Sequence, residues 1–96
     1  MRGVILPADS KRGVITAVYR AVGAPSWAAP NLDALADVLR DLSWLPARPV
    51  RLDWWVSARL PAADRATIAA VLATAQAESA GSGRPITVWR REAPVG

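Results

Sequence analysis

The sequence predicts an α/β fold in which a three-stranded parallel sheet packs against three to four helices. The chain has 96 residues, of which 52% are hydrophobic and five are tryptophan, so it can bury one hydrophobic core. Segments typical of strands are separated by segments of helical periodicity, and strands in that order pair in parallel through right-handed crossovers. We therefore expect a single domain over residues 1–96, with a frayed tail at about 91–96.

The first segments predict a strand followed by a helix. Residues 3–6, "GVIL", form a short apolar run that ends at Pro7, which is typical of a buried strand. Asp9 or Ser10 can cap a helix that ends at Gly23. The apolar positions of this helix recur every four residues, at Val14, Val18 and Val22. This spacing predicts that one face of the helix is buried.

A loop and a second helix follow. The loop "GAPSWAAP", residues 23–30, is too rich in proline and small residues for regular structure, and it presents Trp27. Asn31 is a favourable N-cap residue, and leucines at helical spacing come directly after it. They are Leu32, Leu35, Leu39 and Leu42. The opposite side of the helix carries Asp33, Asp37 and Asp41. We expect the leucine side to be buried and the aspartate side to be exposed.

The second half of the chain predicts two strands separated by a helix. In residues 50–55, "VRLDWW", the apolar residues Val50, Leu52 and Trp54 alternate with Arg51, Asp53 and Trp55. This alternation and the bulky side chains are typical of a strand. Residues 62–79 are rich in alanine and predict a helix that ends before "GSG". Its buried positions are expected at Ile68, Val71, Leu72 and Ala75. Residues 85–89, "PITVW", predict the last strand.

The composition excludes most catalytic machinery. The chain has no cysteine and no histidine, so it lacks a thiol nucleophile, the usual general base and the commonest metal ligand. We expect no catalytic residues, no cofactor and no metal site. No apolar run is long enough to span a membrane, and the run near the N-terminus is too short for a signal peptide. We therefore expect a cytoplasmic protein that does not enter the membrane.

The charge balance is basic, with 12 lysines and arginines against eight acidic residues and a pI of about 11.1. Such a balance can indicate an anionic partner such as nucleic acid. The basic residues are, however, scattered from Arg2 to Arg91 without a dense run. This distribution favours an ordinary solvated surface.

Asp33, Asp37 and Asp41 recur every fourth residue, a spacing at which like charges repel along a helix. They can be the solvated side of an amphipathic helix, a catalytic carboxylate pair or a magnesium site. A fourth interpretation is that the aspartates recognise a partner protein. A row of fixed carboxylates imitates a phosphodiester backbone and suits a cationic groove that holds RNA or DNA.

The stretch "APSWAAPNLDALADVL", residues 24–39, resembles the signature of the barstar family, intracellular inhibitors of extracellular-type ribonucleases. The family hallmark is a loop with an aromatic residue that enters N-L-D-A-L-x-D at the start of the second helix. "PVRLDW" at 49–54 and "GRPITV" at 83–88 are similar to the second and third strands of the family. The resemblance favours the recognition interpretation over the other three.

The resemblance implies that the loop and the second helix block the active site of a nuclease. Asp37 would be the central carboxylate in the phosphate pocket, and Asp33 would contact further basic groups. Ala36 lies between these aspartates, where the family usually has a bulky aromatic residue. The other partner-binding positions that the resemblance implies are Trp27, Asn31, Leu32, Arg40, Asp41, Trp44 and Glu78.

The expected function is therefore inhibition of a ribonuclease by a monomer that binds 1:1 and makes no direct contact with nucleic acid. The best-known family members are acidic, whereas this chain has a net charge of +4. Its target is then expected to be acidic as a whole but cationic at its active site. One alternative is an immunity protein of the same fold against a toxin that is not a ribonuclease. Another is a basic nucleic-acid-binding module, and a small carboxylate enzyme ranks third.

Overall fold

The computed structural model describes residues 1–95 and confirms the predicted α/β class. Its elements lie in the expected order and include three helices. They are β1 (Arg2–Ile5), α1 (Lys11–Val22), α2 (Leu32–Asp41), β2 (Val50–Val56), α3 (Ala62–Ser79) and β3 (Ile86–Glu92).

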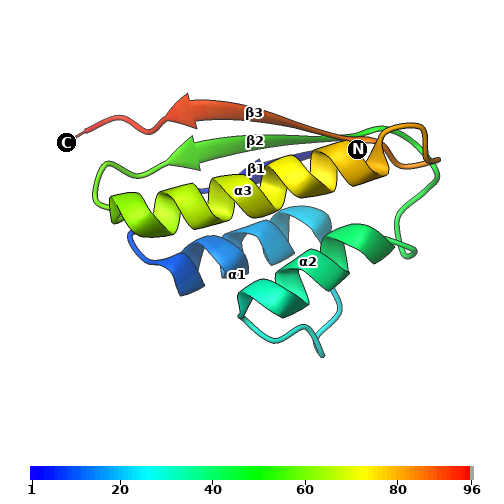
Figure 1. The fold of residues 1–96 in the computed structure, drawn as a ribbon, viewed down its shortest axis with the longest axis horizontal. Coiled ribbons are helices and arrows are strands. Elements are labelled where there is room, and N and C mark those ends of the chain that lie inside the picture. Colours follow the sequence, from blue (N-terminus) through cyan, green and yellow to red (C-terminus); the bar gives the residue numbers. More distant parts are fainter. Residues whose placement is uncertain (96) are drawn as a thin grey trace.

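The three strands form one parallel sheet in the order β1-β2-β3. Among the described residues, all three helices lie on the same side of this sheet, and none covers the other side (Figure 1). Helix α1 packs against β1 and α3 packs against β3, whereas α2 packs mainly against α3 and α1. Helix α2 is therefore the element furthest from the sheet, and its outer side faces away from it (Figure 1).

The helix ends follow the capping residues that the sequence indicates. At the start of α1, the Gly13 N–H donates to Ser10 Oγ over 3.0 Å, so Ser10 and not Asp9 is the cap. Gly23 ends this helix in the left-handed conformation, with φ of 64°, which glycine adopts without steric cost. At the start of α2, the Ala34 N–H donates to Asn31 Oδ1 over 2.8 Å.

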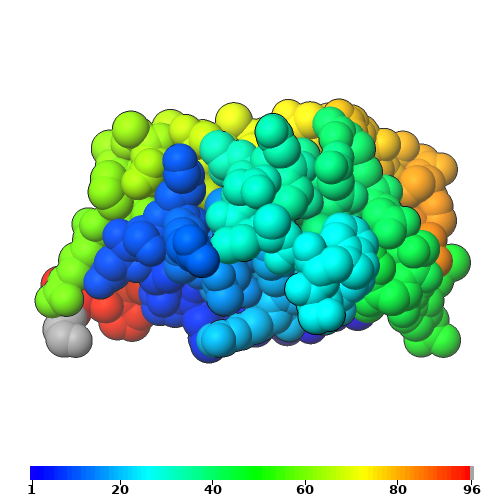
Figure 2. All heavy atoms as spheres, turned by 90° about the horizontal axis from the view of Figure 1, so that it is seen from below, coloured from blue at the N-terminus to red at the C-terminus, as the bar shows by residue number. Residues whose placement is uncertain are grey.

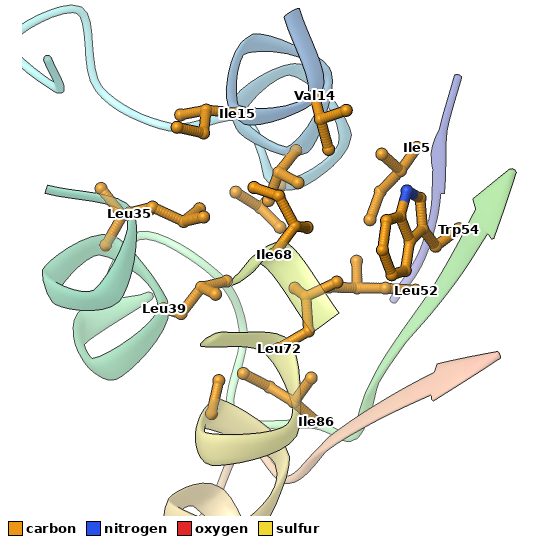
Figure 3. Close-up of a cluster of buried hydrophobic side chains, with 14 of the residues drawn as sticks. Ile5, Val14, Ile15, Leu35, Leu39, Leu52, Trp54, Ile68, Leu72 and Ile86 are labelled. Carbon is orange, nitrogen blue, oxygen red and sulfur yellow. The ribbon is translucent and has the colours of Figure 1, made fainter. Parts of the chain in front are cut away.

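The core lies between the sheet and the helices (Figure 3). Trp54 of β2 is 2% exposed and lies beside Ile5 of β1, facing the helices (Figure 3). The predicted buried side of α1 is confirmed. The leucine side of α2 is buried as predicted except at Leu32, which is half-buried, and the apolar residues of β2 are buried as well. In α3, Ile68, Leu72 and Ala75 are buried, and Val71 is only half-buried.

The prediction that the last strand ends at Trp89 is wrong, because β3 continues to Glu92. Residues 90–92 pair with Trp54, Trp55 and Val56 of β2, respectively. Residues 91 and 92 therefore belong to the strand and not to the frayed tail predicted at about 91–96. Pairing with the central strand supplies the backbone hydrogen bonds that the local sequence does not predict.

Candidate functional site

The loop between α1 and α2 exposes an aromatic side chain on a well-supported backbone. Trp27 is 66% exposed. Two residues later, the Ala29 carbonyl accepts a hydrogen bond of 2.7 Å from the Tyr19 hydroxyl of α1. The Ala28 N–H donates to the Pro25 carbonyl over 3.1 Å, and the Ala28 side chain packs against the core. The loop is therefore fixed on both sides of Trp27.

Helix α2 presents the three aspartates as the sequence predicts. Asp33, Asp37 and Asp41 are all exposed, and the opposite side of the helix is buried through Leu35, Val38 and Leu39. Leu32, in the first turn, is half-buried against the core, and the cap residue Asn31 is exposed. Figure 2 views the molecule from the helix side, where the loop (cyan) and α2 (blue-green to green) lie together on the surface. The loop and the aspartates thus share one face of the molecule.

Arg40 joins α2 to α3 at this face. Its Nη1 lies 3.3 Å from Asp37 Oδ1, and its Nε lies 3.1 Å from Glu78 Oε2. The side chains of Asp37 and Glu78 remain 73% and 46% exposed. Tertiary packing therefore brings Glu78 next to the aspartate row. We call Asp33, Asp37, Asp41 and Glu78, together with Arg40, the acidic face.

Tyr19 also lies near this row. Burial raises the pKa of the Tyr19 hydroxyl above its usual value, and the negative charge of Asp37 raises this pKa further. The neutral hydroxyl is thus the favoured form, as its hydrogen bond to the Ala29 carbonyl requires. One α1 residue therefore connects the loop with the neighbourhood of Asp37.

Two of the predicted site residues lie at the sides of the acidic face. Ala36 is half-buried and lines a hollow of about 260 Å³ between α2 and α3, together with Arg40, Val71 and Glu78. Trp44 is half-buried, and its Nε1–H donates to the Val22 carbonyl over 2.9 Å. Its polar group is thus used inside the chain to hold the connector after α2 against the end of α1.

Sequence reasoning missed the role of Tyr19 and the double contact of Arg40. Tyr19 follows Val18 in a helix whose buried side was clear, but no local pattern indicates that its hydroxyl reaches residue 29. The pairing of Arg40 with Asp37 is an i,i+3 pair on one helix and could have been found from spacing. Its pairing with Glu78 spans 38 residues and could not.

Within residues 1–95, no group of histidine, cysteine, aspartate and glutamate side chains is arranged to hold a metal ion. In the part of the chain that the structure describes, none of the helices has the length and apolar character that crossing a membrane requires. The exposed face described above consists of carboxylates, one guanidinium group and one indole. Such a surface is chemically suited to recognising a cationic partner by hydrogen bonds and ion pairs.

Comparison with known proteins gives one finding. The family model described as "Barstar (barnase inhibitor)" matches residues 7–90 of the chain. This match includes the loop, all three helices and most of the sheet. None of the curated proteins compared with the sequence matches it.

Proposed function

The chain belongs to the barstar family, and on this basis we propose that it blocks the active site of a ribonuclease with the loop at residues 24–30 and with α2. Family members inhibit barnase-like ribonucleases and are not enzymes, so the family implies a ribonuclease as the partner in general. The proposal for this chain is more specific. It concerns the face that binds, the role of each side chain and the kind of nuclease.

The observation that carries the proposal is the row of exposed aspartates on a helix whose other side is buried. The helix backbone that carries the carboxylates is held in place because α2 is capped by Asn31 and packed through Leu35 and Leu39. A nuclease active site holds cationic groups where the phosphates of its substrate bind. Carboxylates on short side chains of an ordered helix can occupy those anion sites without the entropy loss of ordering the backbone.

Asp37 is the proposed centre of the interface, with Asp33 towards the loop and Asp41 towards the rim. In the free protein, Arg40 contacts both Asp37 and Glu78. Because these side chains are exposed, the contacts contribute little to folding stability. In the proposed mechanism, Arg40 holds Asp37 and Glu78 together in the free protein. When the partner binds, cationic groups of the nuclease can replace Arg40 at both carboxylates.

Trp27 is the proposed apolar contact beside the carboxylates, since exposed aromatic residues commonly dominate binding energy. Asn31 and Leu32 would contact the partner at the helix start. The hollow next to Ala36 can receive an apolar side chain of the nuclease, because Ala36, Ala70 and Val71 form part of its lining. Trp44 and Glu78 would contact the partner at the margin. The complex would be 1:1 and would form in the cytoplasm.

Inhibition assays with purified ribonucleases test this proposal. The double variant Asp33→Asn/Asp37→Asn should weaken inhibition by several orders of magnitude. The matched control Asp64→Asn/Glu92→Gln removes two carboxylates outside the acidic face and should leave the inhibition constant nearly unchanged. Equal losses in the two variants would contradict the proposed face. If no ribonuclease is inhibited but another class of toxin is, the chain is an immunity protein that uses the same fold.

A further inference from the structure

The side of the sheet that faces away from the helices carries a group of charged and aromatic side chains. Alternate residues of the three strands point to this open face, and the register brings them into rows. Arg2 pairs with Arg51 across β1 and β2, Asp53 pairs with Trp89, and Trp55 pairs with Arg91 across β2 and β3. These six residues, which we call the arginine-tryptophan face, come from both ends and the middle of the sequence.

Asp53 holds the arginines of this face in place. Its side chain is 2% exposed, with Arg2 Nε 2.8 Å from Oδ2 and Arg51 Nη2 3.1 Å from Oδ1. Arg91 Nε lies 3.9 Å from Oδ1. Three guanidinium groups thus surround one carboxylate and leave a surplus charge of +2. Each guanidinium has five N–H donors. Arg2 uses one of them at Asp53, and Arg51 uses two.

The two tryptophans of this face lie beside the same arginines. The Arg51 guanidinium lies 4.6 Å from the centre of the Trp89 ring, and the Arg91 guanidinium lies 6.0 Å from the Trp55 ring. Trp89 is nevertheless 52% exposed, and the Arg2 and Arg91 side chains are 64% and 44% exposed. The result is an open surface on which indole rings and guanidinium planes alternate.

We propose that the arginine-tryptophan face binds single-stranded nucleic acid, with phosphates at Arg2, Arg51 and Arg91 and with bases stacked on Trp89 and Trp55. Surfaces that bind single strands combine a positive charge for the backbone with aromatic rings on which bases stack. Because Asp53 fixes the guanidinium groups, their free donors are already oriented. A sheet without a covering helix is accessible to a flexible strand along its whole surface (Figure 1).

The arginine-tryptophan face contributes +2 to the basic net charge. The acidic face carries four of the eight acidic residues and one arginine, a net charge of −3, which leaves +7 on the rest of a chain of net charge +4. An inhibitor that used only its acidic face would need no such excess. This inference departs from the expectation that the chain makes no direct contact with nucleic acid. It is independent of the proposed inhibition, because the two faces lie on opposite sides of the molecule.

The test is fluorescence anisotropy with a labelled single-stranded RNA of mixed sequence, about twelve nucleotides long, titrated with the full chain at several salt concentrations. With three phosphate contacts, the logarithm of the binding constant should fall with the logarithm of salt at a slope of about −2. The variant Arg51→Gln/Arg91→Gln should bind on the order of tenfold more weakly or worse at low salt. Its control, Lys11→Gln/Arg20→Gln, removes the same charge from exposed positions of α1 and should bind nearly as well as the original chain.

Trp89→Ala separates stacking from charge, since it leaves every arginine in place. It should weaken binding on the order of tenfold, and thermal melts should show that the variant stays folded. Equal losses in the two double variants, an unchanged affinity for Trp89→Ala, or equally strong binding of polyglutamate would each overturn the proposal. Asp37→Ala should leave RNA binding intact, so failure of this proposal and failure of the inhibitor proposal give different results.

Discussion

Arg40 and Asp53 show how single residues organise the two faces of this molecule. Arg40 is a cation placed among carboxylates, within 3.3 Å of Asp37 and 3.1 Å of Glu78. Asp53 is a carboxylate placed among cations, with Arg2 and Arg51 as its nearest partners. The difference is burial. Arg40 and its partners are exposed to solvent, whereas the Asp53 carboxylate is buried between its arginine partners.

Asp37→Ala should weaken ribonuclease inhibition far more than Asp41→Ala. A carboxylate that is desolvated against several guanidinium groups leaves those charges buried and unpaired when it is removed. We expect a loss of several kcal/mol for Asp37→Ala, the size of the charged hot spot known for barstar. Inhibition constants measure the effect.

The control for this comparison is folding stability. Thermal melts of Asp37→Ala and Asp41→Ala should stay close to that of the original chain, because exposed ion pairs contribute at most about 1 kcal/mol. Equal and small losses of inhibition in Asp33→Ala, Asp37→Ala and Asp41→Ala would mean that the aspartates are only the solvated side of a helix.

Asp53 should make folding stability fall in acid. Its hydrogen bond from Arg2 is the main cause that lowers the pKa of this carboxyl, and Arg51 lowers the pKa further. The folded protein then binds this proton less tightly than the unfolded chain does. The stabilising contribution is complete above the ordinary pKa of 3.8 and is lost as the pH falls below that value.

Melting temperatures between about pH 5 and about pH 2 measure this effect. The decrease should be smaller in Asp53→Asn than in the original chain, because the amide does not titrate there. Arg2→Gln removes the main cause of the lowered pKa, so its decrease should lie between the other two. Parallel curves for all three proteins would show that Asp53 does not control acid stability.

At the scale of elements, α2 uses one side for packing in the fold and leaves the other side available for binding a partner. Helices α1 and α3 cover the sheet, and α2 packs on these two helices through its leucine side. Its aspartate side is therefore not needed for packing.

Helix α1 lies close to β1, and this close approach depends on Gly3. A Cβ atom at this position would lie 2.8 Å from the Ala21 carbonyl oxygen of α1.

Gly3→Ala should therefore destabilise the fold, since overpacking of a tight contact typically costs about 1–3 kcal/mol. The contact atom belongs to the backbone, so α1 or β1 must move. Gly83→Ala is the matched control, because its Cβ would lie 3.7 Å from Ala47 in ordinary contact. Denaturant unfolding of both variants measures the difference. A Gly3→Ala protein as stable as Gly83→Ala would show that the two elements can separate at no cost.

At the scale of the whole molecule, charge is distributed unevenly. The acidic face belongs to α2 and α3 on the helix side, and the arginine-tryptophan face belongs to the strands, on the side of the sheet that faces away from the helices (Figure 1). Long-range attraction depends on the net charge of +4, whereas binding in close contact depends on the local face. For a nuclease with a positive net charge and a cationic active site, the net charge of this chain is repelled at long range, whereas its acidic face is attracted in close contact.

Association should consequently be faster with an acidic ribonuclease than with a strongly basic one at low salt. Stopped-flow association rates across ionic strength measure this difference. Added salt should slow association with the acidic enzyme and should speed association with the basic one. If the basic enzyme associates faster and is slowed by salt, the net charge does not select the partner in the way proposed.

The sequence alone determined the type and order of the elements and the two sides of α2. Capping by Ser10, Gly23 and Asn31, the period of the leucines and the alternation in β2 are all local signals, which act between residues a few positions apart. For the same reason the candidate aspartates and Trp27 could be identified before their exposure was known. Their roles in binding stay predictions.

Which distant side chains meet depends on the three-dimensional fold. The basic residues looked scattered, yet strand register places Arg2, Arg51 and Arg91 around Asp53, which lies 51 residues from Arg2. Packing of α3 on α2 brings Glu78 to Arg40, and pairing with β2 extends β3 to Glu92. Such contacts depend on register and on helix packing, which are properties of the whole core. No stretch of neighbouring residues encodes them.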